Sequence, residues 1–171
     1  GIFDGQGFAV RGLTVNGADC GGLFGFLDSA EVKNLVLLNA FIDAKEAGGI
    51  AASSKSSSIT ACKSFGEIRG QNAGGIAGLV TNSTVTNCFN FAEINAGENA
   101  GGIAYHLSQN SVLSKSINHG DISAGENAAG LAGVCFGSID YCINTGFVTS
   151  RDAAAGIAAD HRGRITYSSN H

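Results

Sequence analysis

One phrase returns at nearly even intervals along the chain, and this repeat constrains the fold more than any other feature. Gly-Gly-Ile-Ala or a close variant begins at Gly21, Gly48, Gly74, Gly101, Ala129 and Ala155. The apolar third residue of each phrase lies 26 to 28 residues from the next one. A regular period of this length is typical of solenoids, in which each repeat contacts only its neighbours.

A second block of ten residues repeats between these phrases, and we number its positions as columns one to ten. The copies begin at Ile59, Val85, Leu113, Ile139 and Ile165. Apolar residues occupy the first and tenth columns, Cys or Ser the fourth, and small residues the eighth. Asn occupies the sixth column in every copy except the first, which has Ser64. Because Gly, Asn and Ser interrupt each unit, the pattern excludes long helices and favours short β-strands.

The sequence therefore predicts an all-β fold, a parallel β-solenoid (β-helix) of about six coils of 26–28 residues. Parallel crossover connections favour right-handed winding. Successive coils should stack about 4.8 Å apart, which aligns the apolar columns into aliphatic ladders. The Asn residues of the sixth column should form an amide ladder at an inward turn, each side chain donating to the next.

Residues 1–20 differ in spacing from the later units and are predicted to form the leading strands of an N-terminal cap. Residues 21–171 are predicted to form one domain of tandem coils. The last unit stops partway through the repeat, so we expect flanking domains in a longer protein.

Composition narrows the class of function. With 44% hydrophobic and 14% charged residues, the chain has the balance of a globular domain. Its net charge of −4 and scattered Lys and Arg argue against nucleic-acid binding. No apolar run reaches the roughly 18 to 20 residues of a membrane-spanning segment. The five Cys have no zinc-like spacing and are predicted to fill the core. Cys62 and Cys88 should be free thiols, because their Cβ atoms would lie about 4.8 Å apart, beyond disulfide range.

Several phrases resemble a known family. FDGQGFAVRGLTVNG and the repeated AGGIAG followed by NCFNFAEI are similar to the GLUG repeat. That repeat occurs in tandem in secreted and surface-anchored bacterial proteins, including non-catalytic parts of immunoglobulin A proteases. The resemblance implies an extracellular stalk or adhesion region with β-solenoid structure. It brings no catalytic motif, and the HExxH zinc motif of the associated peptidase domains is absent here.

Two outward columns hold the candidate surface-binding residues. Glu67, Glu93 and Asp121 share the ninth column on adjacent coils, so their carboxylates should follow one another at about 4.8 Å. Carboxylates about 5–5.5 Å apart can cleave glycosidic bonds, but a ladder on a convex face favours a solvated polar surface instead. Phe65 and Phe91 share the seventh column. They could serve as sugar-stacking platforms if exposed, or pack at a corner of the solenoid.

Other chemistry has weaker support. His119 and His171 share a column but lie two coils apart, about 10 Å, too far to bind one transition metal. A second acidic strip is predicted at the turns, and calcium could neutralise it, although the GGxGxD motif is missing. The alternative is an acidic edge with Asn72, Asn99 and Asn127 shaping the turns. The strip comprises Glu46, Glu98, Glu126 and Asp152.

No catalytic residue, cofactor or resident metal is therefore predicted. No GxSxG motif is present, and the single broken Thr rank of the second column does not match an ice-binding surface. We expect a non-enzymatic structural module of a secreted or cell-surface bacterial protein. An adhesin-like binder of host protein or glycan is the second hypothesis, and a glycan-active β-helix enzyme is the third.

Overall fold

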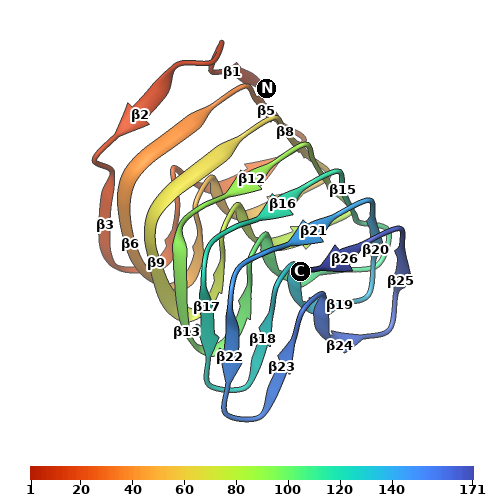
Figure 1. The fold of residues 1–171 in the computed structure, drawn as a ribbon. Helices are drawn as coiled ribbons and strands as arrows, with labels where there is room; N and C mark the ends of the chain where they lie inside the picture. Colours follow the sequence, from red (N-terminus) through yellow and green to blue (C-terminus); the bar gives the residue numbers. More distant parts are fainter.

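The chain folds into a helix-free stack of short strands wound into coils that follow one another along a common axis (Figure 1). The computed structural model describes all residues from 1 to 171. Strands from successive coils pair in parallel throughout. The predicted all-β parallel solenoid of about six coils is confirmed.

Three sheets form the sides of the solenoid. The first has seven strands: β1 (Ile2–Asp4), β5 (Glu31–Lys33), β8 (Ser58–Thr60), β11 (Thr84–Thr86), β15 (Val112–Ser114), β20 (Ser138–Asp140) and β25 (Arg164–Thr166). The second has six: β4 (Phe24–Asp28), β7 (Ala51–Lys55), β10 (Ala77–Thr81), β14 (Ala104–Leu107), β19 (Ala132–Cys135) and β24 (Ala158–His161).

The third sheet is the largest, with 13 strands. In the early coils it is built from long bent strands, and in the later coils from shorter pieces of the same path. Its strands are β2 (Ala9–Arg11), β3 (Thr14–Gly21), β6 (Val36–Gly48), β9 (Lys63–Gly74), β12 (Phe89–Asn90), β13 (Glu93–Gly101), β16 (Ile117–Asn118), β17 (Ile122–Ala124), β18 (Asn127–Ala129), β21 (Ile143–Asn144), β22 (Val148–Ser150), β23 (Ala153–Ala155) and β26 (Ser169–Asn170).

Residues 1–20 join this stack as its first winding. Strand β1 pairs with β5, and β2 and β3 both pair with β6. Most of these residues are exposed, and their pairing is with strands of the second coil. No helix of the length and hydropathy needed to cross a bilayer is present.

The apolar columns lie in register and form the core. The amide nitrogen of Ile50 donates to the Ile76 carbonyl, and that of Ile76 donates to the Ile103 carbonyl. In the first sheet, Val85 lies between Ile59 and Leu113. All of these side chains are completely buried. Burial of this extent contributes roughly 1.5–3 kcal/mol per side chain, so the ladders are the main source of stability.

A left-handed residue turns the chain at the corner between the first and third sheets. Its φ lies between 47° and 55° in Asn34, Ala61, Asn87, Lys115, Tyr141 and Tyr167. The next residue points inward; it is Leu35 in the first of these corners and a fourth-column Cys or Ser in the other five, where its side chain donates to the carbonyl two residues earlier. The Cys88 thiol donates to Thr86 at 3.3 Å, and the Ser116 hydroxyl donates to Ser114 at 2.8 Å. Cys and Ser alternate here because both are small donors, so the Cys residues do more than fill the core.

The predicted amide ladder is confirmed in the sixth column. The Nδ2 atom of Asn90 donates to Oδ1 of Asn118 at 2.8 Å, and Asn118 and Asn144 donate onward to the next amide in the same way. Each of these three residues also bonds its own backbone two residues later, as Asn118 does to the Gly120 carbonyl at 2.7 Å. Asn90, Asn118 and Asn144 are fully buried. The ladder therefore satisfies an inward turn of each coil with side-chain hydrogen bonds.

Ser64 occupies the sixth column one coil before the first amide of this ladder, and we expect Ser64→Asn to extend it. The Ser64 hydroxyl is buried without a hydrogen-bond partner. A Cβ added to Gly49 would lie 2.4 Å from Ser64 Oγ, as one added to Gly75 would lie 2.3 Å from Asn90 Cγ, so similar backbone surrounds both positions. The new amide should donate to Asn90 and raise the free energy of unfolding by about 0.5–1.5 kcal/mol.

Thermal unfolding followed by circular dichroism measures this gain, which should appear as a rise of about 2–4 °C for each kcal/mol. Ser54→Asn is the matched control. Ser54 is also buried with an unpaired hydroxyl, but it lies between Leu27 and Val80, where an amide finds no ladder. Ser54→Asn should destabilise. A loss of stability in both variants would contradict the ladder account.

Candidate functional site

The seventh column presents a stack of aromatic rings on the outside of the third sheet. The rings of Phe65 and Phe91 are parallel within 2° with centroids 4.5 Å apart, and His119 lies on the other side of Phe91 at 4.7 Å. Nδ1 of His119 is 2.8 Å from the Thr145 hydroxyl in the next coil. The structure thus brings the predicted Phe65 and Phe91 together. Both faces of Phe91 are covered, so this ring offers an edge rather than a face to a ligand.

Apolar side chains of the fifth column lie beside this stack. Phe89, Ile117 and Ile143 are aligned on β12, β16 and β21 and are half-buried. They are not part of the core, because the inward neighbours in these strands are the Asn residues of the ladder. Together the two columns form the outward apolar face, which comprises Phe65, Phe89, Phe91, Ile117 and Ile143.

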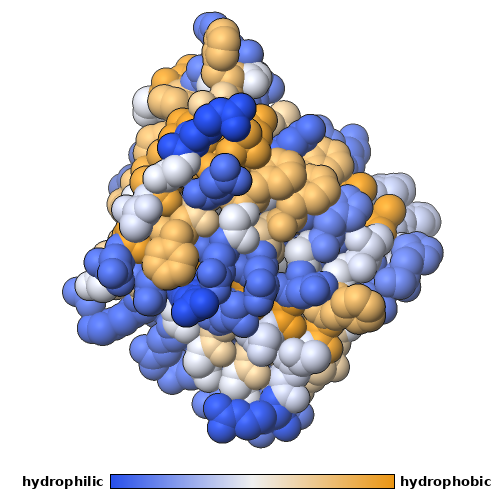
Figure 2. Space-filling model, turned by 60° about the vertical axis from the view of Figure 1, so that its left-hand side comes forward, coloured by the Kyte–Doolittle hydropathy of each residue, from blue (hydrophilic) through white to orange (hydrophobic).

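Apolar and hydrophilic patches alternate over the surface that Figure 2 shows. Sequence reasoning singled out the seventh column but missed Ile117 and Ile143. The signal was available: these residues precede the inward Asn of the sixth column by one position and must point outward in a strand.

The ninth column brings the predicted acids together on adjacent coils, each with its own partner. Glu93 is in register with Glu67. Glu67 forms an ion pair with Arg69 on the same strand. Glu93 accepts from Asn95 Nδ2 at 3.1 Å, and Asp121 accepts from the backbone N–H of Phe147 at 3.0 Å. Neither Glu93 nor Asp121 has a cationic partner within 4.0 Å. Two uncompensated carboxylates therefore flank the outward apolar face.

A shallow hollow of about 230 Å³ lies along this acidic column. Its two rims are ninth-column side chains and the side chains two residues later, from three adjacent coils. They are Glu93, Asp121 and Phe147 on one side and Asn95, Ser123 and Thr149 on the other. The hollow is smaller than the roughly 300–1,000 Å³ typical of pockets for small molecules. It offers hydrogen-bond acceptors on an open surface.

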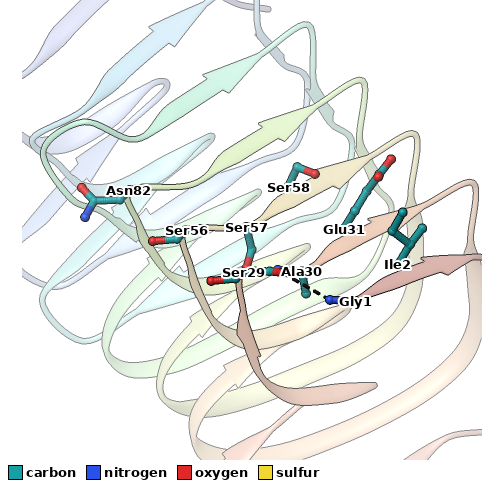
Figure 3. A pocket seen from close by; sticks show the side chains of 9 residues that line it. All are labelled: Gly1, Ile2, Ser29, Ala30, Glu31, Ser56, Ser57, Ser58 and Asn82. Carbon is teal, nitrogen blue, oxygen red and sulfur yellow. Dashed lines mark hydrogen bonds between the residues drawn. The ribbon is translucent and has the colours of Figure 1, made fainter.

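A second hollow, of about 570 Å³, lies at the corner between the first and second sheets (Figure 3). Small polar side chains such as Ser29, Ser56 and Ser58 line it, and the Gly1 ammonium group donates to the Ser29 carbonyl at 3.3 Å. Its one carboxylate, Glu31, is 2.8 Å from Lys33 Nζ. The only ionisable side chain that lines the hollow is therefore already in an ion pair.

The predicted acidic strip at the turns needs one correction. Glu46 is in register with Asn72, so it does not align with Glu98. Glu98, Glu126 and Asp152 do follow one another in adjacent coils. The spacing could have revealed this, because Glu46 precedes its Gly-Gly phrase by two residues and the others precede theirs by three.

Glu46 instead begins a second amide ladder. It accepts from Asn72 Nδ2 at 3.1 Å, Asn99 donates to Asn72 at 2.7 Å, and Asn127 donates to Asn99 at 2.8 Å. The residues expected to shape the turns therefore tie consecutive turns together.

Burial and the neighbouring Glu46 carboxylate raise the pKa of Tyr105 well above its ordinary value.

The structure assembles no candidate transition-metal site. His119 and His171 share a column with Thr145 between them, as predicted. No group of three or more His, Cys, Asp or Glu side chains lies close enough together to hold a metal ion. The second column carries hydroxyl contacts between coils, such as Thr86 to Ser114 at 3.0 Å.

All five Cys are free, which confirms the prediction for Cys62 and Cys88. Four are buried, but the prediction that all five Cys fill the core is wrong for Cys20, which is exposed on β3 of the first winding. Burial raises the pKa of the Cys135 and Cys142 thiols to about 11 and also raises the pKa of Cys88. A hydrogen bond with the Cys88 thiol lowers the pKa of Cys62, but the Cys62 side chain is completely buried. Since a reagent must reach the thiolate to react with it, we expect all four buried thiols to be inert in the folded chain.

We therefore expect one equivalent of Ellman's reagent to react quickly with the native chain at pH 8, at Cys20, and five equivalents to react after denaturation. Cys20→Ser should abolish the fast phase without changing the unfolding temperature. Fast reaction of two or more thiols in the native chain would show that the coils open readily.

The fold and its surface define the chain as a β-solenoid repeat protein. No protein-family profile matches the sequence. No curated protein is significantly similar to it. Among solved structures, the chain is similar to the crystal structure of a candidate immunoglobulin A1 protease from Bacteroides ovatus, with a TM-score of 0.64 and 16% identity over 99% of this chain and 68% of that one. This likeness shows a shared fold.

Proposed function

We propose that this chain is a rigid, non-catalytic segment of a secreted or cell-surface bacterial protein. It would serve as a spacer that also presents an interaction surface. The observation that carries this proposal is that the side-chain columns stay aligned from coil to coil along the stack, with only local register shifts in the third sheet. A rod whose coils each contact only their neighbours holds flanking parts of a protein at a fixed distance.

Two resemblances support this proposal. The structural neighbour from Bacteroides ovatus is described as a candidate immunoglobulin A1 protease, and its solenoid is shared with this chain. The repeated phrases are similar to the GLUG repeat of bacterial surface proteins. A structural role within an immunoglobulin A protease-like protein and an extracellular location are consistent with both.

Removal of one whole coil tests the spacer. Deletion of residues 75–101 joins Gly74 to Gly102 and removes one period of 27 residues. The shortened chain should keep its β-sheet circular dichroism and a cooperative melt, and X-ray scattering should show a rod shorter by about 4.8 Å. In the full-length protein, activities of flanking domains should survive the deletion.

Deletion of residues 75–87 is the matched control, because it removes 13 residues and breaks the register. This variant should lose the cooperative melt. If deletion of the whole coil also unfolds the chain, or abolishes an activity of the full-length protein, the spacer proposal is wrong.

Adhesin-like binding is the second candidate function, and the outward apolar face favours it. Phe91 is 40% exposed, and its neighbours in the fifth and seventh columns are half-buried on the surface rather than in the core. Exposed apolar patches on soluble proteins often mark interaction sites. Glycan cleavage has less support, because Glu67, Glu93 and Asp121 each bond to a neighbouring group and line an open, shallow surface.

A further inference from the structure

We propose that the outward apolar face binds a short segment of another protein that carries apolar side chains and, along one side, Lys or Arg. The inference deepens the proposed role as an interaction surface and rests on it. The face consists of Phe65, Phe89, Phe91, Ile117 and Ile143, and the acidic flank consists of Glu93 and Asp121.

The dimensions of the face favour a short segment. Its residues span four coils, which are three steps of about 4.8 Å, or roughly 14 Å along the axis. About nine residues of helix, or four to five residues of extended chain, cover this length. A face two columns wide is too small for the roughly 800 Å² that each partner of a standard protein interface buries. A peptide-like segment fits it better than a folded surface.

The chemistry of the face favours a protein segment over a sugar. A stacked sugar needs an open aromatic face, but Phe65 and His119 cover the two sides of Phe91 with centroids 4.5 Å and 4.7 Å away. Ile117 and Ile143 continue the face with aliphatic surface. Aliphatic and ring-edge surface gains most from contact with other apolar side chains.

The charges beside the face indicate the sign of the charge that the bound segment carries. Glu93 and Asp121 follow Phe91 and His119 by two residues in their coils and have no cationic partner. Lys63 is the fifth-column residue aligned with Phe89 in the preceding coil, and its ammonium group lies over the Phe89 ring at 5.6 Å, in the column farther from these carboxylates. A segment with Lys or Arg on the acidic side would pair these carboxylates, and rim charges of this kind steer association and set orientation.

Three synthetic 12-residue peptides test the proposal against the intact chain by fluorescence anisotropy. One contains Leu and Lys, one Leu and Glu, and one Ser and Lys, in the same alternating order. The Leu/Lys peptide should bind at least about tenfold more tightly than either other peptide, since it alone has both apolar surface and positive charge. Its affinity should fall as salt is raised.

Variants of the chain locate the binding. Phe91→Ser and Ile117→Ser should each lower the affinity for the Leu/Lys peptide at least about fivefold, the loss typical of an interface anchor. Phe26→Ser is the matched control, because Phe26 is 58% exposed on the second sheet, and it should leave binding unchanged. Circular dichroism melts establish that all three variants are folded.

Charge variants separate specific pairing from general attraction. Glu93→Gln with Asp121→Asn should weaken binding about threefold or more at low salt. Glu98→Gln with Glu126→Gln removes the same charge from the turns and should change binding by less than half as much. Equal effects of the two pairs, equal effects of Phe26→Ser and Phe91→Ser, or no peptide binding would overturn the proposal.

A glycan array distinguishes the alternative ligand class. If the chain binds glycans and Phe91→Ser abolishes that binding, the face is a sugar site and the proposal of a protein segment is wrong. Failure of peptide binding does not touch the spacer role, which the coil deletion tests separately. If the coil deletion disproves the spacer role but the intact chain binds the peptide, peptide binding by this surface remains as the proposed function of the chain.

Discussion

Replacement of Asn118 by Ala is expected to lower the free energy of unfolding by about 3–5 kcal/mol. Asn118 is fully buried in the middle of the sixth-column ladder. It accepts from Asn90, donates to Asn144, and bonds the Gly120 N–H and carbonyl at 3.3 Å and 2.7 Å. Alanine removes all four bonds, leaves buried polar groups unpaired, and opens a cavity at the turn.

Urea or thermal unfolding measures this loss. Asn170→Ala is the matched control, because Asn170 has the same column position but is exposed and forms one side-chain bond, from Asn144 at 2.6 Å. Asn170→Ala should lower the free energy of unfolding by less than about 1 kcal/mol. Similar losses in the two variants would show that the ladder bonds contribute little and that stability resides in the aliphatic columns alone.

The second residue of the Gly-Gly phrase should be equally intolerant, and we expect Gly102→Ala to destabilise by more than about 3 kcal/mol or to prevent folding. An added Cβ would lie 2.2 Å from the Gly130 carbonyl oxygen and 2.4 Å from Asn118 Cγ. One contact is backbone of the next coil and the other is a buried ladder residue. Neither can move aside without breaking the stack.

Gly97→Ala is the control for this substitution. A Cβ at Gly97 meets no atom closer than 3.8 Å, so the change should lie within about 0.5 kcal/mol of the parent. Soluble yield and thermal unfolding compare the two variants. A stable, cooperatively folding Gly102→Ala chain would contradict the close approach of the coils at the Asn ladder.

The two Gly positions of the phrase differ in their variation along the chain and in the groups that they contact. The second Gly of the phrase is present in all six copies, whereas the first is replaced at Ala129 and Ala155. In the last five copies, only the second Gly lies against the ladder column, with an added Cβ about 2.3–2.4 Å from its side chain. A Cβ added to the first Gly, at Gly48, Gly74 or Gly101, would lie 1.8–2.1 Å from a backbone carbonyl oxygen, so the two positions differ in what they contact and not in how closely they are packed.

Much of the fold could be predicted because the same type of residue recurs at the same position of each coil. The inward positions at Ile59 and Asn118, the free thiols and the amide ladder all follow from a period near 27 residues and an alternating strand. Errors arose where one coil departs from the rest. Glu46 was aligned with Glu98 because both are acidic, although its spacing matched that of Asn72.

The surface was harder to predict, because its character depends on which neighbours cover a side chain. Sequence reasoning placed Phe65 and Phe91 in one column but could not tell whether their faces would be free. The rings stack on each other at the coil spacing, which removes Phe91 as a platform and leaves an edge-lined strip. Ile117 completes that strip, but an Ile in a strand is usually a core residue, so its residue type alone does not indicate an outward position.

The amide ladder of the sixth column also gives the rod a direction. Every Nδ2 from Asn90 to Asn144 donates toward the later coil, and every acceptor oxygen faces back. An inverted coil inserted into the stack would set donor against donor at one junction and acceptor against acceptor at the other. Coils of this type can therefore be multiplied or removed head to tail during evolution, but never flipped.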